Sequence, residues 1–443
     1  MEDMKNVLMI SYYYPPLNDV GILRTIGFSN HLRHFGWQPI ILTVKNPDLH
    51  CCSLDLRQTN QKQIVYRSRS IVNCSRFAGK LNGLISRIVK LVGGNLEHEL
   101  IPNLLLVPDF ACGWIPLTII KGLRLISAHK IDVIFATCNP MSSAIIGAIL
   151  SRLSGKRLII DLRDPWRDGI VQKMVGNRLR AYAHIGDRWK DFMDRMLETK
   201  TLGQASKVIL VTQETLEVYS KLYPFLRNRL EVIHNGYADG LFAGEPGKRF
   251  DVFTIVYSGS YYYYLDKSEA FFQALANIKN DNGLNGNIRF LYIGKSSIVS
   301  KMIRKYDLSG IIDCPGYLGR KEAISLMTMA SVILLRNVRP HLSTKLFEGL
   351  ASGIPFIALT GEGEAANLIR KYSPSSSIVG TSDTKEIEGA IRTMYTKWTE
   401  GKLSYEVNNE FKNTFSKYKL TEKVANVLDN CMNSNAGETG LNG

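Results

Sequence analysis

The sequence predicts an α/β protein made of two doubly wound, Rossmann-like domains, and three observations lead to this fold class. The chain has 443 residues, which is enough for two domains of ordinary size. Near the amino end, two apolar runs at residues 6–11 and 37–44 flank a helical pattern over residues 23–35. In the second half, the apolar run 331–335 precedes a helix that begins near Ser343, and another apolar run ends at Leu359. Such strand–helix–strand units build parallel sheets.

The remaining elements continue the alternation of strands and helices. Short runs rich in Val, Ile and Leu predict strands, because a buried parallel strand is apolar on both faces. Apolar residues three and four positions apart predict helices, and Gly36 and Gly155 follow two of them. We expect further strands at residues 132–137, 157–161, 207–212, 230–233, 254–257, 289–293, 311–314 and 377–379, and further helices at residues 114–129, 144–153, 187–204, 322–330, 365–372, 385–396 and 421–431, with another ending at Ile278.

Composition restricts the partners of the chain. The formal net charge is +15 and the pI is about 9.4, which favours an anionic partner such as a phosphate-bearing substrate, an acidic phospholipid or nucleic acid. No zinc-finger pattern, RNP-type aromatic run or basic tail supports nucleic acid, so we exclude that partner. The seven cysteines are scattered without CxxC spacing, which is typical of a reduced, cytoplasmic protein without a zinc site.

Targeting signals are not expected. The chain runs from Met1 almost directly into the first predicted strand, so we expect no cleaved signal peptide. The most apolar long window, residues 103–120, is interrupted by Pro108, Asp109 and Pro116, which argues against a membrane-spanning helix. We therefore expect a cytoplasmic protein.

The helix that begins near Ser343 carries the first candidate site. In parallel α/β sheets, ligands bind beyond the carboxyl ends of strands, where the next helix begins. Ser343, Thr344 and Lys345 lie at such a start, where free N–H groups and the helix dipole hold an anion such as a phosphate. Glu348 follows Lys345 by three residues, on the same edge of the helix, and its carboxylate can accept hydrogen bonds from a nucleotide ribose. From spacing alone, a surface Lys–Glu pair explains the pattern equally well.

The run K-L-F-E-G-L-A-S-G-I-P-F-I-A, which starts at Lys345, resembles the donor-site helix of family 4 (group 1) glycosyltransferases, retaining enzymes of the GT-B fold and often of the bacterial polysaccharide type. The resemblance implies two Rossmann-like domains that face a central cleft. It also implies that Glu348 binds the ribose and that the helix start faces the diphosphate. Many members carry a glutamate eight residues before that position, where this chain has Pro340. The identity of the transferred sugar is therefore less constrained.

The amino-terminal segment Y-Y-P-P-x-N-D-V-G-I-L-R also resembles that family. Its Pro-Pro turn and Gly21 are implied to bring a loop to the donor side of the cleft. Arg24 lies at the start of the following helix and is a candidate for acceptor binding, with a surface arginine as the alternative.

The segment D161-L-R-D-P-W166 follows a predicted strand and resembles D-x-R-D-x-W segments of the same subfamily. A guanidinium and carboxylates at the carboxyl end of a strand suit substrate chemistry. Arg163 and Asp164 are therefore candidate catalytic residues, for acceptor binding or assistance as a base. The alternative is an internal ion pair that fixes the loop. Asn139, after the neighbouring strand 132–137, is a further candidate for acceptor binding.

A second donor segment follows the first strand of the carboxyl-terminal half. Gly259 and Ser260 form a small-residue loop whose N–H groups can approach a phosphate, and Lys267 can neutralise its charge. Family members use basic residues in this place. The tyrosines at positions 261–264 either stack a base or pack the domain. No D-x-D pair occurs in a suitable position, so we expect neither a metal nor another cofactor beside the nucleotide sugar, which is a co-substrate.

The segment from Arg76 to Val92 predicts a basic amphipathic helix. Apolar residues recur at helical spacing, and four basic residues lie between them. A helix of this type binds anionic membranes, whereas the alternative is an ordinary helix whose apolar side faces the core. The protein is then cytoplasmic, with a peripheral position at the inner face of the cell membrane.

The resemblance covers residues 5–430 and implies four parts. These are an acceptor-binding domain (residues 1–248), a nucleotide-sugar-binding domain (249–404), a helical segment that crosses back to the first domain (405–432) and a disordered tail (433–443). The expected function is retaining transfer of a sugar from a nucleotide diphosphate, UDP rather than GDP, to a hydroxyl of a lipid-linked or growing cell-surface polysaccharide precursor. The alternatives are a catalytically silent, nucleotide-sugar-binding assembly partner and a sugar-nucleotide epimerase on the same fold.

Overall fold

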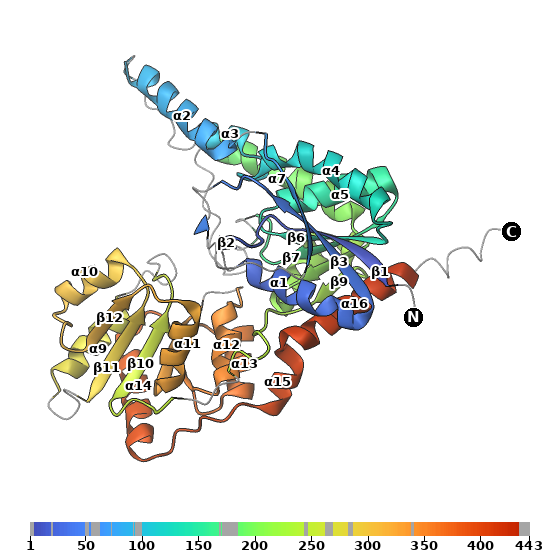
Figure 1. Cartoon of the computed structure of the whole chain (residues 1–443). Coiled ribbons are helices and arrows are strands. Elements are labelled where there is room, and N and C mark those ends of the chain that lie inside the picture. Colours follow the sequence, from blue (N-terminus) through green and yellow to red (C-terminus); the bar gives the residue numbers. More distant parts are fainter. Residues whose placement is uncertain are drawn as a thin grey trace. The chain divides into compact units, whose positions relative to one another are not determined.

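The computed structural model describes residues 4–18, 21–48, 53–54, 63–71, 73–91, 93, 100–167, 170, 185–242, 247–261, 269–281, 287–337 and 341–433. The chain divides into two compact units, both visible in Figure 1. Unit 1 comprises Met1–His234 together with Lys417–Gly443, and unit 2 comprises Asn235–Ser416. The contacts therefore divide the chain after His234, whereas the sequence suggested a boundary after residue 248.

Unit 1 is built on a parallel sheet of seven strands in the order β5-β3-β1-β6-β7-β8-β9. The strands are β1 (Lys5–Ile10), β3 (Trp37–Val44), β5 (Ile64–Ser68), β6 (Val133–Cys138), β7 (Arg157–Leu162), β8 (Lys207–Leu210) and β9 (Leu230–Val232). A separate antiparallel pair joins β2 (Leu17–Asn18) to β4 (Ser53–Leu54). Since all seven strands run the same way, their carboxyl ends meet at one edge, where ligands of such sheets bind.

Both faces of this sheet are covered, which explains the continuous apolar runs in the sequence. Leu8 and Ile10 point to the face covered by α4 (Ile115–Ala128), α5 (Ser142–Ser154) and α7 (Ile185–Gln204). Val7 and Met9 alternate with them and point to the face covered by α1 (Ile22–His31) and α16 (Lys417–Asn433). The other helices are α2 (Cys74–Leu91), α3 (Leu100–Leu105), α8 (Gln213–Leu222) and the 3-10 turns η1 (Leu32–Phe35), η2 (Cys112–Trp114) and η3 (Pro224–Leu226). Figure 1 shows the two helical layers.

Unit 2 repeats the architecture with six strands in the order β12-β11-β10-β13-β14-β15, all parallel. The strands are β10 (Phe253–Ser258), β11 (Ile288–Ile293), β12 (Ile312–Gly316), β13 (Val332–Arg336), β14 (Phe356–Leu359) and β15 (Ser377–Val379). The helices are α9 (Ala270–Lys279), α10 (Ser297–Lys305), α11 (Arg320–Met329), α12 (Thr344–Ser352), α13 (Glu364–Tyr372), α14 (Thr384–Thr399) and α15 (Asn409–Phe415). Two apolar clusters fill the two faces of the sheet.

The structure adds several features to the predicted elements. The predicted helix 23–35 ends as a 3-10 turn, and Gly36 then adopts a φ of 79°, which favours glycine. Residues 297–305, which had no predicted element, form α10, and Ser296 caps it by accepting a hydrogen bond from the Ile298 N–H at 3.2 Å. The predicted terminal segment 405–432 is shared between the units, because α15 belongs to unit 2 and α16 to unit 1. Of the predicted tail, residues 434–443 lie outside the described residues.

Candidate functional site

Two of the predicted acceptor-side residues lie together at the carboxyl edge of the unit 1 sheet. Asn139 follows β6 and Asp164 follows β7, and the Asn139 side-chain amide donates a hydrogen bond to Asp164 Oδ2 at 3.2 Å. The backbone N–H of Arg163 donates to the Cys138 carbonyl at 3.3 Å, which ties the two strand ends together. All three predicted residues are partly exposed. This edge therefore presents an amide, a carboxylate and a guanidinium to a ligand.

Arg24 does not share that exposure. It is 2% exposed, and its Nε and Nη2 donate to the Asp161 carboxylate at 2.7 to 3.0 Å. Asp161 also accepts a hydrogen bond from Thr137 Oγ1 at 2.8 Å, and the Arg24 guanidinium donates to the carbonyls of Ile233 and His234. Arg24 thus joins α1 to the carboxyl ends of β7 and β9, and Asp161 in turn bonds to β6. Burial in this pair is at odds with the alternative of a surface arginine, and the acceptor contact of Arg24 stays a prediction.

A buried hydrogen-bond network holds the loop after β7 in place. The Trp166 N–H donates to Tyr219 Oη at 2.9 Å, and Tyr219 Oη donates to Glu198 Oε1 at 2.8 Å. Arg167 Nε donates to the other oxygen of Glu198 at 2.7 Å. Burial, together with the nearby Glu198 carboxylate, raises the pKa of Tyr219 well above its usual value, so the phenol stays a donor. Among the described residues, Asp161 pairs with Arg24 and Arg167 pairs with Glu198 in this part of the chain.

Two neighbouring groups, the Cys138 thiol and the Asp109 carboxyl, lie in buried environments that suit a structural role. Burial raises the pKa of the Cys138 thiol, and the Asp161 carboxylate adds to that effect, so a thiolate is disfavoured. Burial also raises the pKa of Asp109, although this carboxylate accepts hydrogen bonds from the Ser142 N–H at 2.9 Å and from Ser142 Oγ at 2.7 Å. Asp109 thereby caps α5. Gly21 lies at the amino end of α1, and residues 19–20 before it lie outside the described residues.

In unit 2, two predicted donor-side residues lie in direct contact. Gly259 follows β10 and has a φ of 118°, which side-chain-bearing residues rarely adopt. A Cβ atom built on Gly259 would collide with the Lys345 ammonium group. That ammonium also lies 4.7 Å from the centroid of the Tyr257 ring, a cation–π contact. Because Gly259 has no side chain, the Lys345 side chain can pack directly against the backbone of the loop after β10.

The start of α12 has the features of an anion site. Ser343 is its N-cap residue in extended conformation, and its Oγ is buried without a hydrogen-bond partner among the described residues. Its side chain does not cap the helix, so the first N–H groups of α12 remain available to a ligand. Thr344 is partly exposed and Lys345 is exposed. Lys345 therefore links the start of α12 to the loop that contains Gly259.

Glu348 lies one turn further along α12, and its side chain is 14% exposed. Its carboxylate pairs with the guanidinium of Arg320, which starts α11. Sequence reasoning did not find Arg320, because 28 residues separate the two partners. Nearby, the Arg336 guanidinium stacks 3.6 Å from the Tyr261 ring, and that ring packs against Tyr257 and Phe272. Tyr261 therefore packs the domain.

Two residues discussed from the sequence lie outside the described residues. Lys267 falls within residues 262–268, and Pro340 falls within residues 338–340. Their predicted roles stay predictions. Over the described part of the chain, no cluster of three or more His, Cys, Asp or Glu side chains could hold a metal ion.

Comparisons with known proteins identify both halves of the chain. The model of the family "Glycosyltransferase Family 4" matches residues 90–239, and the model of "Glycosyl transferases group 1" matches residues 252–397. Together they cover more than half of the sequence. Among curated proteins, a sequence search found no significant match.

Solved structures show the same fold at low identity. Sucrose-phosphate synthase from Thermosynechococcus elongatus has a TM-score of 0.64 at 14% identity, over 97% of this chain and 100% of that chain. HepE from Anabaena, in complex with UDP and glucose, has a TM-score of 0.63 at 13% identity, over 96% and 100%. UDP-GlcNAc 2-epimerase from Methanocaldococcus jannaschii has a TM-score of 0.54 at 13% identity, over 96% and 100%. The predicted GT-B fold class is confirmed, and the chain belongs to the family 4 (group 1) glycosyltransferases.

Proposed function

We propose that the protein transfers a sugar, with retention of anomeric configuration, from a nucleotide diphosphate to a hydroxyl of a lipid-linked or growing cell-surface polysaccharide precursor. The observation that carries the proposal is the start of α12. There the Ser343 hydroxyl at the N-cap has no partner among the described residues, and the Lys345 ammonium over Gly259 and the Glu348 carboxylate share one edge of the helix. This is the arrangement that a diphosphate followed by a ribose requires.

The donor is expected to bind with its diphosphate at the N–H groups of Ser343 to Lys345 and of Ser260. Lys345 then supplies positive charge without a metal, and Lys267 adds to it. The ribose hydroxyls donate to Glu348, which exchanges its contact with Arg320 for them. UDP is favoured over GDP because HepE, a protein of the same fold, was solved with UDP. Charge that is placed before the reaction stabilises the leaving diphosphate.

In the transfer step, the acceptor hydroxyl oxygen forms the new bond to the anomeric carbon on the face from which the diphosphate departs. The carbon–oxygen bond to the diphosphate breaks, and its electron pair stays on the phosphate oxygen. The acceptor proton moves to that phosphate, so the step needs no enzyme nucleophile. Asn139, Arg163 and Asp164 are the proposed acceptor-side contacts, since they lie together at the carboxyl edge of unit 1.

A thermal-shift titration with UDP, GDP and their common sugars tests the donor site. A ligand that binds only the folded state raises the melting temperature. We expect UDP to stabilise the protein and Glu348→Ala to weaken its binding about tenfold to a hundredfold, because a charged hydrogen-bond acceptor is removed. Glu400→Ala is the matched control, since Glu400 forms an exposed ion pair with Lys402 at 2.8 Å. Equal UDP binding by wild type and Glu348→Ala would refute the site.

Two other functions are distinguished by product analysis. The fold is shared with a UDP-GlcNAc 2-epimerase, so incubation with UDP-GlcNAc alone, followed by NMR, tests for inversion at the sugar C2. Transfer to an acceptor panel without that inversion supports the proposal. Binding of UDP with neither reaction would instead identify a silent assembly partner.

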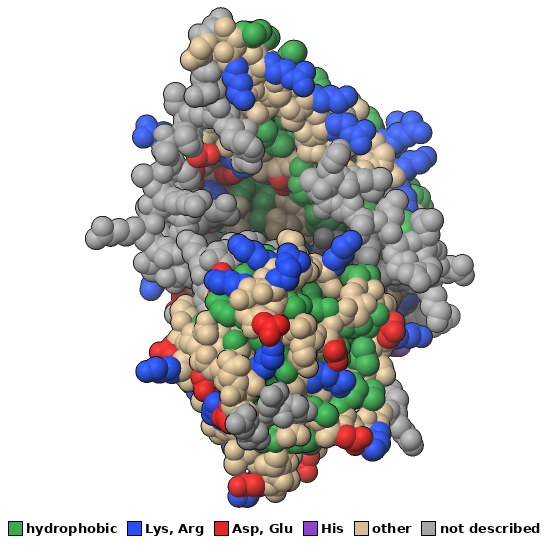
Figure 2. Space-filling model, turned by 90° about the vertical axis from the view of Figure 1, so that its left-hand side faces the viewer, with side chains coloured by type: hydrophobic (Ala, Val, Ile, Leu, Met, Phe, Trp, Pro, Cys, Tyr) green, Lys and Arg blue, Asp and Glu red, His purple; other side chains and the backbone are tan. Residues whose placement is uncertain are grey.

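We also propose a peripheral membrane position, supported by the side chains of α2. Four of its apolar residues are 54% to 86% exposed, namely Phe77, Leu84, Ile88 and Leu91. Arg76, Arg87 and Lys90 each directly precede one of them, so a basic stripe lies beside the apolar stripe. Figure 2 shows Lys and Arg side chains gathered on the upper part of the surface, where α2 lies in Figure 1. No described helix is both long and apolar enough to span a membrane.

The exposure of these residues supports the membrane-binding explanation of the segment from Arg76 to Val92. A helix with its apolar side in the core would bury Leu84 and Ile88, yet both are more than half exposed. An apolar stripe flanked by cations fits the interface of an anionic bilayer. The inner face of the cell membrane is therefore the proposed location.

A further inference from the structure

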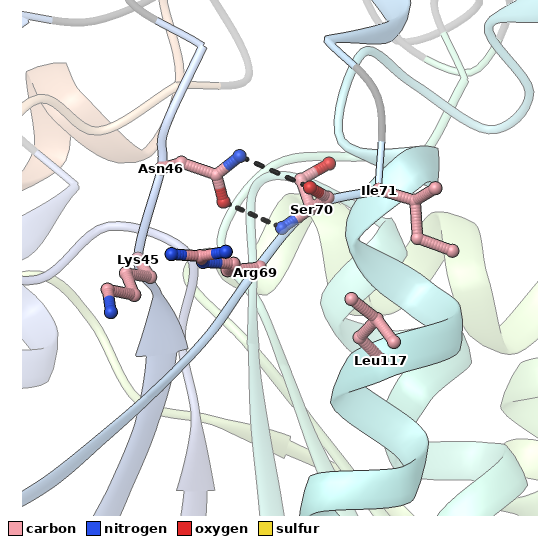
Figure 3. A pocket seen from close by; sticks show the side chains of 6 residues that line it. All are labelled: Lys45, Asn46, Arg69, Ser70, Ile71 and Leu117. Carbon is pink, nitrogen blue, oxygen red and sulfur yellow. Dashed lines mark hydrogen bonds between the residues drawn. The ribbon is translucent and has the colours of Figure 1, made fainter.

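A pocket that none of the predicted residues lines opens at one side of the unit 1 sheet. It has a volume of about 790 Å³ and lies where β3 and β5 end. Figure 3 shows the basic side chains of Lys45 and Arg69 on one side and the apolar side chains of Ile71 and Leu117 on the other. Asn46 and Ser70 complete the lining.

Backbone geometry holds the two basic residues next to each other. β3 and β5 pair in parallel with Val44 opposite Ser68, so Lys45 and Arg69 are the first residues after neighbouring strands. The Lys45 N–H donates to the Ser68 carbonyl at 2.7 Å. Beyond it, the Asn46 side chain accepts from the Ser70 N–H at 2.8 Å and donates to the Ser70 carbonyl at 3.2 Å. The two loops are therefore fixed before any ligand arrives.

The charge of this pair is not neutralised within the described residues. Both side chains are exposed, and neither Lys45 nor Arg69 forms an ion pair there. Two cations held side by side repel each other, and an anion that bridges them removes that repulsion. A phosphate monoester carries close to two negative charges at neutral pH and offers several acceptor oxygens. Lys45 and Arg69 therefore match a phosphate better than a single carboxylate.

The opposite wall is apolar and continues out of the pocket. Ile71 is 57% exposed, Leu117 38% and Ile120, one turn further along α4, 50%. The Ile71 N–H donates to the Gly113 carbonyl at 2.9 Å, which fixes the wall against the start of α4. Three residues after Ile71 the chain enters α2 with its exposed apolar stripe. A purely polar ligand would leave this wall in water, whereas a hydrocarbon chain would cover it.

The position of the pocket suits one end of an acceptor. In the strand order β5-β3-β1-β6-β7, with neighbouring strands about 4.8 Å apart, the carboxyl ends of β3 and β6 are roughly 10 Å apart and those of β5 and β7 roughly 19 Å apart. A ligand anchored at Lys45 and Arg69 therefore reaches Asn139 and Asp164 with a group about the length of a diphosphate and a sugar.

We propose that this pocket binds the phosphate-bearing end of an acceptor lipid. Lys45 and Arg69 hold the phosphate, and the first carbons of the lipid chain lie against Ile71 and Leu117 on their way to the membrane beside α2. This inference rests on the proposed transfer to a lipid-linked hydroxyl and names the residues that select the acceptor class.

Calorimetric titration of the full-length protein with dodecyl phosphate, below its critical micelle concentration, tests the pocket. We expect binding that weakens at least tenfold in Lys45→Ala/Arg69→Ala. The matched control is Arg152→Ala/Lys221→Ala, which removes two exposed basic residues of unit 1 outside the pocket and leaves binding unchanged. We expect Leu117→Asn to weaken dodecyl phosphate binding but not the binding of inorganic phosphate.

Three outcomes would overturn the proposal. In the first, wild type and Lys45→Ala/Arg69→Ala bind dodecyl phosphate with equal affinity. In the second, the wild type binds inorganic phosphate as tightly as dodecyl phosphate. In the third, the wild type binds short-chain phosphatidylglycerol as tightly as dodecyl phosphate. The last would indicate a headgroup of bulk lipid. UDP stabilisation is measured in the same variants and should not change. Loss of the Glu348 effect on UDP with the dodecyl phosphate result intact would refute the donor site alone.

Discussion

At the residue scale, the Arg24–Asp161 pair sets the geometry on which the acceptor side depends. Asp161 is fully buried and Arg24 nearly so, and the pair joins residues 137 positions apart. Asp161 belongs to β7 and lies three residues before Asp164. A change at Arg24 therefore reaches the proposed acceptor contacts through the backbone.

We expect Arg24→Met to lower the free energy of unfolding by about 3–5 kcal/mol, because it leaves the buried Asp161 carboxylate without its partner. Urea unfolding of the purified protein measures the change. The control is Lys419→Met, which breaks an exposed pair with Glu422 and should cost at most about 1 kcal/mol. Similar losses of unfolding free energy in the two variants would show that the buried pair stabilises the protein no more than an exposed pair does.

Gly259 provides a second test at this scale. Gly259→Ala meets both the positive φ and the Lys345 side chain, so we expect a loss of about 1–3 kcal/mol in stability and a loss of UDP binding. Gly401→Ala is the control, since Gly401 has a φ of 65° with nothing within 4 Å of an added Cβ. It should lose stability but keep UDP binding, as followed by thermal shift. If Gly259→Ala still binds UDP, the loop that contains Gly259 does not contribute to donor binding.

At the element scale, α2 is notable for four apolar residues, Phe77, Leu84, Ile88 and Leu91, that are 54% to 86% exposed. We expect Leu84→Ser/Ile88→Ser to reduce co-sedimentation with vesicles that contain phosphatidylglycerol at least severalfold, because apolar area that enters the bilayer is lost. Thermal stability should stay unchanged, since both residues are more than half exposed. Leu153→Ser, at an apolar residue that is 60% exposed on α5, is the control. Vesicle binding that is equal in both variants would exclude α2 as the membrane contact.

The elements that the sequence predicted well are those with an unambiguous local signal. Buried strands such as 6–11 and helix stops such as Gly36 depend on apolar runs and backbone conformation within a few residues. No helix was predicted at α10, although Val299, Met302 and Ile303 recur at helical spacing and Ser296 marks its start.

In the candidate site, too, local motifs could be predicted from the sequence and contacts between distant residues could not. Lys345, Glu348 and the Gly259 loop follow from local motifs. The contacts Arg24–Asp161 and Arg320–Glu348 and the Lys45–Arg69 pocket arise only when the sheet brings distant residues together. No spacing in the sequence carries that information.

At the scale of the whole molecule, α16 completes the core of unit 1 from the far end of the sequence. Leu420, Val424 and Leu428 are buried against the sheet face that carries Val7 and Met9. The Lys417 side chain is also buried and lies where Gly27 leaves room on α1. Without residues 417–433, unit 1 thus lacks the part of this core cluster that α16 supplies.

We expect a chain that stops after Ser416 to be insoluble or to lose cooperative unfolding, because the part of the unit 1 core that α16 covers is then exposed to water. A chain that stops after Asn433 keeps α16 and should behave as wild type. Solubility after expression, and urea unfolding of the soluble fraction, compare the two. A soluble, cooperative chain ending at Ser416 would show that α16 is dispensable for unit 1.

Because unit 1 is formed from both ends of the chain, its last helix is synthesised only after the whole of unit 2. A ribosome that adds about 5–20 residues per second needs roughly 10–40 s to translate unit 2, and α16 follows it. During that interval one side of the first sheet lacks the cover of α16, while unit 2 can already fold. The nascent chain therefore passes through a stage in which its earlier half waits for its last helix, and this is the stage at which chaperone binding should be strongest.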